Sequence, residues 1–174
     1  MMASYLEEVQ KGMDLLASNP KTIFVGQAME FKGHAVSRQV NKYPKEQLLE
    51  MPVMENAQAG ICLGLAIEGF LPVSIYPRFD FAILACDQIF NHIDRWESMF
   101  AGNVKVIIKI LVGTKIPLDG GVQHTANYSE AFASMARTIE IYELTDAKDV
   151  FPVYKMAMEG ENSVIIIEHT QLYA

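Results

Sequence analysis

Apolar positions along the chain switch repeatedly between helical spacing and short continuous runs. Residues 3–18 carry apolar side chains at helical spacing, which predicts an amphipathic helix with Ser4 as its N-cap. The run 22–26 is short and apolar, as buried strands are. The same pattern predicts helices at 34–43, 55–69, 79–100 (with a polar face at Asp87, Asn91, Asp94 and Arg95), 129–137 and 146–160, and strands within 45–51 and at 71–76, 104–112, 139–142 and 164–168.

The alternation of strands and helices predicts an α/β fold. The strands 104–112 and 164–167 are nearly continuous apolar runs, which is typical of strands covered by helices on both sheet faces. We therefore expect a single domain over residues 1–174, with an open, mostly parallel sheet and helices on both faces. Ligands bind such sheets outside the carboxyl ends of the strands. The candidate site elements are the loops 26–33, 77–80 and 113–126 and the start of the 55–69 helix.

Composition and charge narrow the possible functions. Of 174 residues, 51% are hydrophobic and 20% are charged, so a sizeable core is available. A net charge of −7 argues against nucleic acid or an anionic membrane surface as a partner. The longest apolar stretch, around 57–75, is interrupted by Glu68 and Pro72, so we expect no membrane span. Cys62 and Cys86 form no CxxC motif and predict reduced thiols and a cytoplasmic location.

The predicted helix at 55–69 combines an acidic start with an apolar body. Glu55 falls in its first turn, where unpaired N–H groups and the helix dipole favour a carboxylate. A helix that is apolar on nearly all sides belongs inside a domain or at a subunit interface. An interface is favoured because small residues, which allow close backbone approach, form a stripe at Ala57, Gly60 and Gly64.

Several motifs, in chain order, resemble the pyrimidine-binding domain of thiamine-diphosphate enzymes. The similarity to the beta subunit of 2-oxo acid dehydrogenase decarboxylase components is strongest, followed by the central part of transketolase. It covers nearly the whole chain. The motifs are Met51-Pro52-Val53-Met54-Glu55, Gly64-Leu65-Ala66-Ile67-Glu68-Gly69 with Leu71-Pro72-Val73, Asp80-Phe81 with Asp87-Gln88-Ile89-Phe90-Asn91, and Gly120-Gly121-Val122-Gln123-His124-Thr125 with Ser129-Glu130-Ala131.

The chain also departs from this family in three ways. The family's beta subunit continues into a C-terminal domain, whereas we expect this chain to lack that domain. The run 75–79 replaces the usual acidic and aromatic residues before Asp80. The Gly-Asp-Gly plus Asn pattern, by which the family's other domain holds magnesium and diphosphate, is missing, and residues 118–121 do not replace it. The resemblance therefore implies half a thiamine-diphosphate site, with Mg²⁺ held by a separate subunit and a homodimer within a heterotetramer.

Glu55 and His124 are the expected catalytic residues. In the resembling family, a carboxylate at the position of Glu55 binds a ring nitrogen of the aminopyrimidine and helps the cofactor to lose its thiazolium proton. The alternative is a Glu that only satisfies helix-end N–H groups. The resemblance places a substrate-side His at His124, where an imidazole can shuttle protons. The alternative is a loop His that binds a neighbouring carbonyl.

Four further residues are candidates for binding. Phe79 and Phe81 offer aromatic faces for the aminopyrimidine, and the alternative is that both are ordinary core residues. Gln27 follows a strand end and is a candidate for contact with the substrate. Arg78 is suited to bind a substrate carboxylate through two parallel hydrogen bonds. For these two polar residues, solvation or a surface salt bridge is the alternative.

The sequence thus predicts the pyrimidine-binding subunit of a split thiamine-diphosphate enzyme that acts on a 2-oxo acid and is active only with its partner. Two alternatives remain open: a transketolase-like subunit for ketol transfer, and a non-catalytic interaction domain of the same fold. The presence of both Glu55 and His124 argues against the second alternative, because a degenerate copy would be free to lose them.

Overall fold

A six-stranded parallel sheet forms the centre of the described part of the protein. The structure is a computed structural model that describes residues 3–31, 35–115 and 119–173. Every neighbouring pair of strands runs parallel, which confirms the predicted sheet. The strands are β1 (Thr22–Gly26), β2 (Leu48–Glu50), β3 (Leu71–Tyr76), β4 (Ile107–Val112), β5 (Glu140–Leu144) and β6 (Val164–His169), in the order β2-β1-β3-β4-β6-β5.

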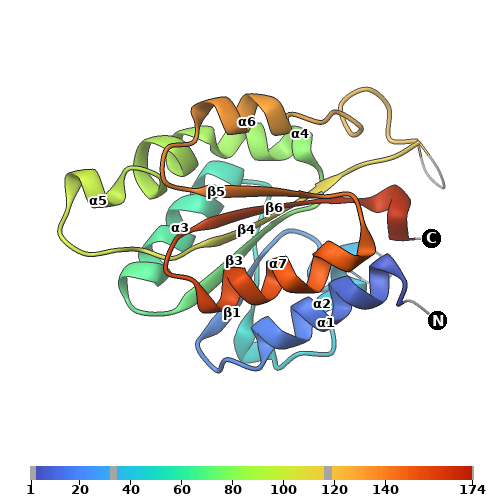
Figure 1. Cartoon of the computed structure of the whole chain (residues 1–174), viewed down its shortest axis with the longest axis horizontal. Helices are drawn as coiled ribbons and strands as arrows, with labels where there is room; N and C mark the ends of the chain where they lie inside the picture. Colours follow the sequence, from blue (N-terminus) through green and yellow to red (C-terminus); the bar gives the residue numbers. More distant parts are fainter. Residues whose placement is uncertain (1–2, 32–34, 116–118, 174) are drawn as a thin grey trace.

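Helices cover both faces of the sheet, as predicted (Figure 1). One face packs against α1 (Tyr5–Ala17), α2 (Ala35–Val40) and α7 (Ala147–Glu159). The other face packs against α3 (Glu55–Ile67), α4 (Phe79–Ala82) and α6 (Ser129–Met135). The shorter helical segments are α5 (Trp96–Met99) and the 3-10 turns at Lys45–Gln47, Ile83–Ala85 and Thr170–Tyr173.

Ser4 caps α1, as the sequence predicts. Its hydroxyl oxygen accepts a hydrogen bond from the Glu7 backbone N–H at 3.3 Å, while the Glu7 carboxylate accepts one from the Ser4 N–H at 2.7 Å. This reciprocal capping box satisfies two otherwise unpaired donors and fixes where the helix begins.

The predicted single helix at 79–100 is wrong. The segment forms α4, a 3-10 turn, a π-helical stretch at Asp87–Ile93 and α5. Because a π turn contains more residues than an α turn, a helical face predicted from α-helical spacing does not continue through it. Asp94, expected on the polar face, is 1% exposed, and its carboxylate accepts backbone N–H groups from residues 137–139 at 2.8 to 3.2 Å.

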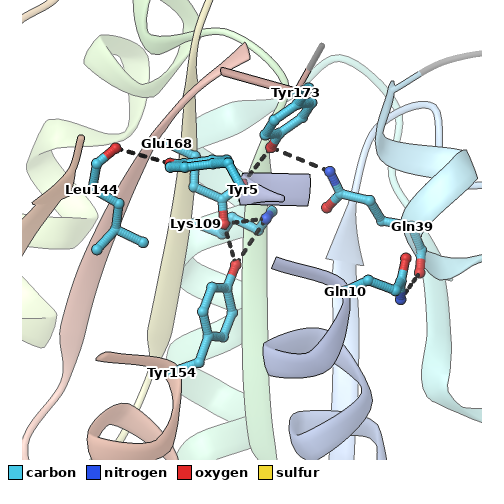
Figure 2. A network of polar contacts seen from close by, with 8 residues as sticks. All are labelled: Tyr5, Gln10, Gln39, Lys109, Leu144, Tyr154, Glu168 and Tyr173. Atoms are coloured by element: carbon cyan, nitrogen blue, oxygen red, sulfur yellow. Dashed lines mark hydrogen bonds and ion pairs between the residues drawn. The ribbon is translucent and has the colours of Figure 1, made fainter. Parts of the chain in front are cut away.

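A buried ion pair joins β4 to β6 on the face covered by α1 and α7 (Figure 2). The Lys109 ammonium lies 2.6 Å from Glu168 Oε1 and donates to the Tyr154 hydroxyl at 2.8 Å. The hydroxyls of Tyr154 and Tyr173 both donate to the Glu168 carboxylate. Burial lowers the pKa of Lys109, and the Glu168 charge opposes that shift. The network therefore ties the C-terminal 3-10 turn to the sheet.

The strand order reverses between β1 and β3. The chain first moves from β1 to β2 at one edge, and then returns to place β3 on the other side of β1. At such a switch point the connections leave in opposite directions and open a crevice beyond the carboxyl ends of the two strands. The residues that follow β1 and β3 are therefore the first place to look for a site.

Candidate functional site

Glu55 lies at this crevice, at the first position of α3. Only 4% of the surface of Glu55 is exposed to solvent. Gln27, which follows β1, donates its side-chain Nε2–H to Glu55 Oε1 at 3.0 Å. Within the described residues this is the one hydrogen bond to the Glu55 carboxylate, so Oε2 has no partner there. Oε2 is not one of the fully buried atoms that lack a partner in the described residues, so its accessible side can receive a ligand.

Gln58 fixes the position of α3 relative to the crevice. Its Nε2 donates to the Val25 carbonyl at 3.3 Å, the Ser74 hydroxyl at 3.0 Å and the Ile75 carbonyl at 3.1 Å. These acceptors belong to β1 and β3, so the helix start is fixed across the switch point. The sequence analysis missed this residue, although an amide in an apolar helix one turn after Glu55 was a visible signal.

Tyr76 ends β3 within the core on the same face as α3. Its ring is fully buried, and its hydroxyl has no hydrogen-bond partner among the described residues. Burial raises the pKa of Tyr76, the nearby Ser74 hydroxyl partly offsets that rise, and the Glu55 charge adds a smaller increase. The phenol therefore stays protonated and is a second unpaired polar group near the carboxylate.

A second group of candidate residues gathers at the ends of β3 and β4. The rings of Phe81 and His124 meet edge to face with centroids 5.4 Å apart. A Cβ placed on Gly113 would lie 1.9 Å from the His124 carbonyl oxygen and 3.0 Å from Arg78 Cδ, so all three residues are close. Nδ1 of His124 is buried without a partner in the described residues. The three candidates Arg78, Phe81 and His124 therefore lie together.

Phe79 lies apart from these residues. It is fully buried and stacks on Phe132 with a centroid distance of 4.9 Å, while Tyr128 meets its edge at 5.7 Å. This environment is that of a core aromatic side chain, whereas Phe81 is only half-buried. Of the two predicted aromatic contacts, Phe81 is the more accessible.

Glu143 and His169 anchor the loop that carries His124, and the sequence analysis named neither for the site. The Glu143 carboxylate accepts from Asn127 Nδ2 at 2.8 Å and lies 2.7 Å from His169 Nε2. Burial alone would raise the pKa of Glu143, but hydrogen bonds from Ser129, Asn127 and His169 outweigh it and lower the pKa. The carboxylate thus stays ionised and holds the loop at neutral pH. Residues 32–33 and 116–118 of the predicted site loops lie outside the described residues.

Three further properties of the described residues concern membrane spans, metal binding and the two cysteine thiols. No helix among them is long and apolar enough to cross a membrane. They contain no group of three or more His, Cys, Asp or Glu side chains that could hold a metal ion. Cys62 and Cys86 are free thiols, and burial raises the pKa of Cys62 to about 12. Cys62 therefore remains a protonated, unreactive core side chain at neutral pH.

Comparison with known proteins identifies the family of the chain. Residues 5–174 match the family described as the transketolase pyrimidine-binding domain. The chain belongs to this family. The match to a pyrimidine-binding domain confirms the family resemblance predicted from the motifs, and it covers both the Glu55 helix and the His124 loop.

The curated relatives carry the names of pyruvate dehydrogenase subunits. The E1 component subunit beta of Mycoplasma pneumoniae is 26% identical over 180 residues, which cover 99% of this chain and 54% of that protein. The mitochondrial E1 subunit beta-2 of rice (Oryza sativa subsp. japonica) is 26% identical over 161 residues, covering 91% of this chain and 43% of that protein. This pyrimidine-binding chain thus spans about half the length of the relatives it matches.

A solved structure has the same fold. It is titled as a split gene transketolase in an inactive beta4 tetramer, with a TM-score of 0.73 and 22% sequence identity. The alignment covers 97% of this chain and 52% of that one. At this identity the likeness establishes the architecture of a transketolase-like pyrimidine-binding domain.

Proposed function

We propose that this chain is the pyrimidine-binding subunit of a split thiamine-diphosphate enzyme that acts on a 2-oxo acid. The proposal rests on the Glu55 carboxylate, which is 4% exposed, begins α3 beside the switch point of the sheet, and has one donor among the described residues. Its Oε2 has no partner there and is suited to accept a hydrogen bond from a protonated ring nitrogen. The E1 beta names of the relatives support the 2-oxo acid class.

The residues around Glu55 fit an aminopyrimidine. When bound, thiamine diphosphate supplies the reactive thiazolium carbon that cleaves a bond beside a substrate carbonyl. Glu55 would share a proton between Oε2 and the ring nitrogen, while Gln27 orients the carboxylate through Oε1. The Tyr76 hydroxyl and Gln58 Oε1 are two further polar atoms without a partner among the described residues. The half-buried ring of Phe81 is the better candidate for stacking than the core residue Phe79.

His124 and Arg78 make up the substrate side in this proposal. Nδ1 of His124 is committed to no hydrogen bond among the described residues, and an imidazole can move a proton to or from a substrate oxygen. The Arg78 guanidinium donates to the Pro77 carbonyl at 3.2 Å and has further N–H groups for a carboxylate. The Arg78 cation beside the His124 imidazole is therefore suited to bind the carboxylate of a 2-oxo acid.

A separate subunit completes the enzyme in this proposal, and it holds the diphosphate and Mg²⁺. The names of the relatives, an E1 subunit beta and a split gene transketolase, support such a division. We expect a homodimer of this chain within a heterotetramer. The cytoplasmic location stays a prediction, and several relatives carry the names of mitochondrial proteins.

The purified chain alone should bind thiamine diphosphate and Mg²⁺ weakly, because the residues that hold the diphosphate belong to the partner. Calorimetric titration measures this directly, and a micromolar or tighter dissociation constant for the chain alone would contradict the split site. Adding a subunit that carries the magnesium and diphosphate motif should produce tight binding and release of CO₂ from a 2-oxo acid. Ketol transfer in that complex, without CO₂ release, would favour the transketolase-like alternative.

Gly64→Leu should weaken self-association while leaving the fold of the chain intact. A Cβ on Gly64 meets no atom within 4 Å, so the larger side chain projects into open space. It would keep a second backbone away from the exposed side of α3, where Met54 is 55% and Ile61 is 39% exposed. Multi-angle light scattering should show a shift from dimer toward monomer. Ala133→Leu on α6 is the control: it adds the same side chain at another exposed helix position and should leave the mass of the oligomer unchanged.

A further inference from the structure

Glu50, the last residue of β2, binds the loop that follows β1. Its Oε1 accepts the backbone N–H of Ala28 at 2.8 Å, and its Oε2 accepts those of Met29 at 2.6 Å and Glu30 at 3.0 Å. Successive N–H groups that converge in this way form a nest for an anion, here filled by the protein's own carboxylate. The nest requires Ala28 to adopt φ of 58°, a left-handed conformation that is unfavourable for residues with a Cβ.

This contact fixes the backbone on one side of Gln27, and the sheet fixes the other side. Gly26 pairs with Glu50 in β2 and with Ile75 in β3. The approach to β3 is so close that a Cβ on Gly26 would lie 2.8 Å from the Ile75 carbonyl oxygen. With both neighbours held, Gln27 has little freedom except at its side chain, which reaches the Glu55 carboxylate at 3.0 Å.

We infer that Glu50 is a positioning residue for Glu55 and acts through Gln27. Without the Glu50 charge the nest loses its anion: a Gln in its place keeps one acceptor oxygen but turns an NH₂ donor toward the N–H groups, so Ala28 is released to return to negative φ. That change rotates the loop and withdraws the Gln27 amide from Glu55 Oε1. The Glu55 carboxylate then loses the donor that sets the direction of Oε2. This inference deepens the proposed function and rests on it for its catalytic consequence, but its structural step stands on the loop contacts alone.

The structural step is tested on the full chain without any cofactor. In ¹⁵N relaxation measurements, the Gln27 side-chain amide should have an order parameter near that of rigid backbone, about 0.85, and Glu50→Gln should lower it below about 0.6. The Gln27→Leu variant lacks the Gln27 side-chain amide, so the amide signal that is missing from its spectrum is assigned to Gln27. Glu30→Gln removes the same charge from an exposed position in the same loop and should change nothing. Glu50→Asp keeps the charge but shortens its reach, and should give a smaller fall. An unchanged Gln27 amide in Glu50→Gln would overturn the inference.

The catalytic step is tested in the complex with the partner subunit, by exchange of the thiazolium proton of bound thiamine diphosphate with deuterated solvent. Glu50→Gln should slow exchange by roughly 10- to 10²-fold, since small displacements of a catalytic group have effects of this size. The double variant with Gln27→Leu should be no slower than the slower single variant, because both act on one contact. If the double variant slowed exchange by the product of the two single factors, Glu50 would not act through Gln27, and the inference would be overturned. If Glu55→Gln itself leaves exchange unchanged, the proposed function fails, whereas the amide measurement still decides the structural step.

Discussion

Lys109→Met should destabilise the fold by about 3–5 kcal/mol, because it leaves the Glu168 carboxylate charged, buried and without its cation. Both side chains of the pair are fully buried. The Tyr154 and Tyr173 hydroxyls still donate to the carboxylate in this variant, so the expected loss is that of the cation alone. Urea denaturation should show a lower midpoint at an unchanged m-value, as expected when stability alone has changed.

A matched control separates burial from charge in this prediction. Lys155 lies 3.9 Å from Glu159 on the exposed side of α7, and Lys155→Met should leave the midpoint essentially unchanged. The double variant Lys109→Met with Glu168→Gln should be no less stable than Lys109→Met alone, because it removes the orphaned charge and keeps an acceptor oxygen for the tyrosine hydroxyls. A fall in the free energy of unfolding of less than about 1 kcal/mol in Lys109→Met would mean that water or another cation reaches Glu168. That result would contradict a network closed to solvent.

This network shows the limit of what the strand patterns predict. The apolar runs around Lys109 and Glu168 predict two buried strands, and β4 and β6 confirm both. A charged residue in each run, with opposite signs, was a signal for a buried pair. The partners are separated by 59 positions in the chain, and only the register of β4 against β6 brings them together. Registers between distant strands depend on the packing of the whole fold, which periodicity does not contain.

At the site, too, local sequence predicts where a residue lies along its helix but not which distant residue it contacts. The position of Glu55 at a helix start follows from Pro52 and the apolar run after it, and the structure places it there. Its contact with Gln27 depends on the left-handed Ala28 and the Glu50 nest, and no local pattern predicts either. The π turn at 87–93 shifts the helical faces that follow it, which is why α-helical spacing misplaced Asp94.

Glu55→Gln should slow exchange of the thiazolium proton of bound thiamine diphosphate by about 10²–10⁴-fold in the complex with the partner subunit. The substitution keeps the size of the side chain, and its carbonyl oxygen can still accept the hydrogen bond from Gln27 Nε2. A neutral amide cannot hold the proton that a carboxylate shares with a ring nitrogen. Acid quenching followed by proton NMR measures the fraction of cofactor that has exchanged.

The same variant decides between the two interpretations of Glu55. The carboxylate accepts from Gln27 and not from a helix-end N–H among the described residues, so the structural alternative is a Glu55 that only holds this contact. In that case Glu55→Gln should change the free energy of unfolding by about 1 kcal/mol or less and leave exchange intact. Glu68→Gln, at the exposed C-terminal end of α3, removes a charge from the same helix and should affect neither quantity. Near-UV circular dichroism and light scattering must show that the variant folds and assembles normally. Unchanged exchange in such a complex would make Glu55 a structural residue, and the proposed catalytic half-site would have to be withdrawn.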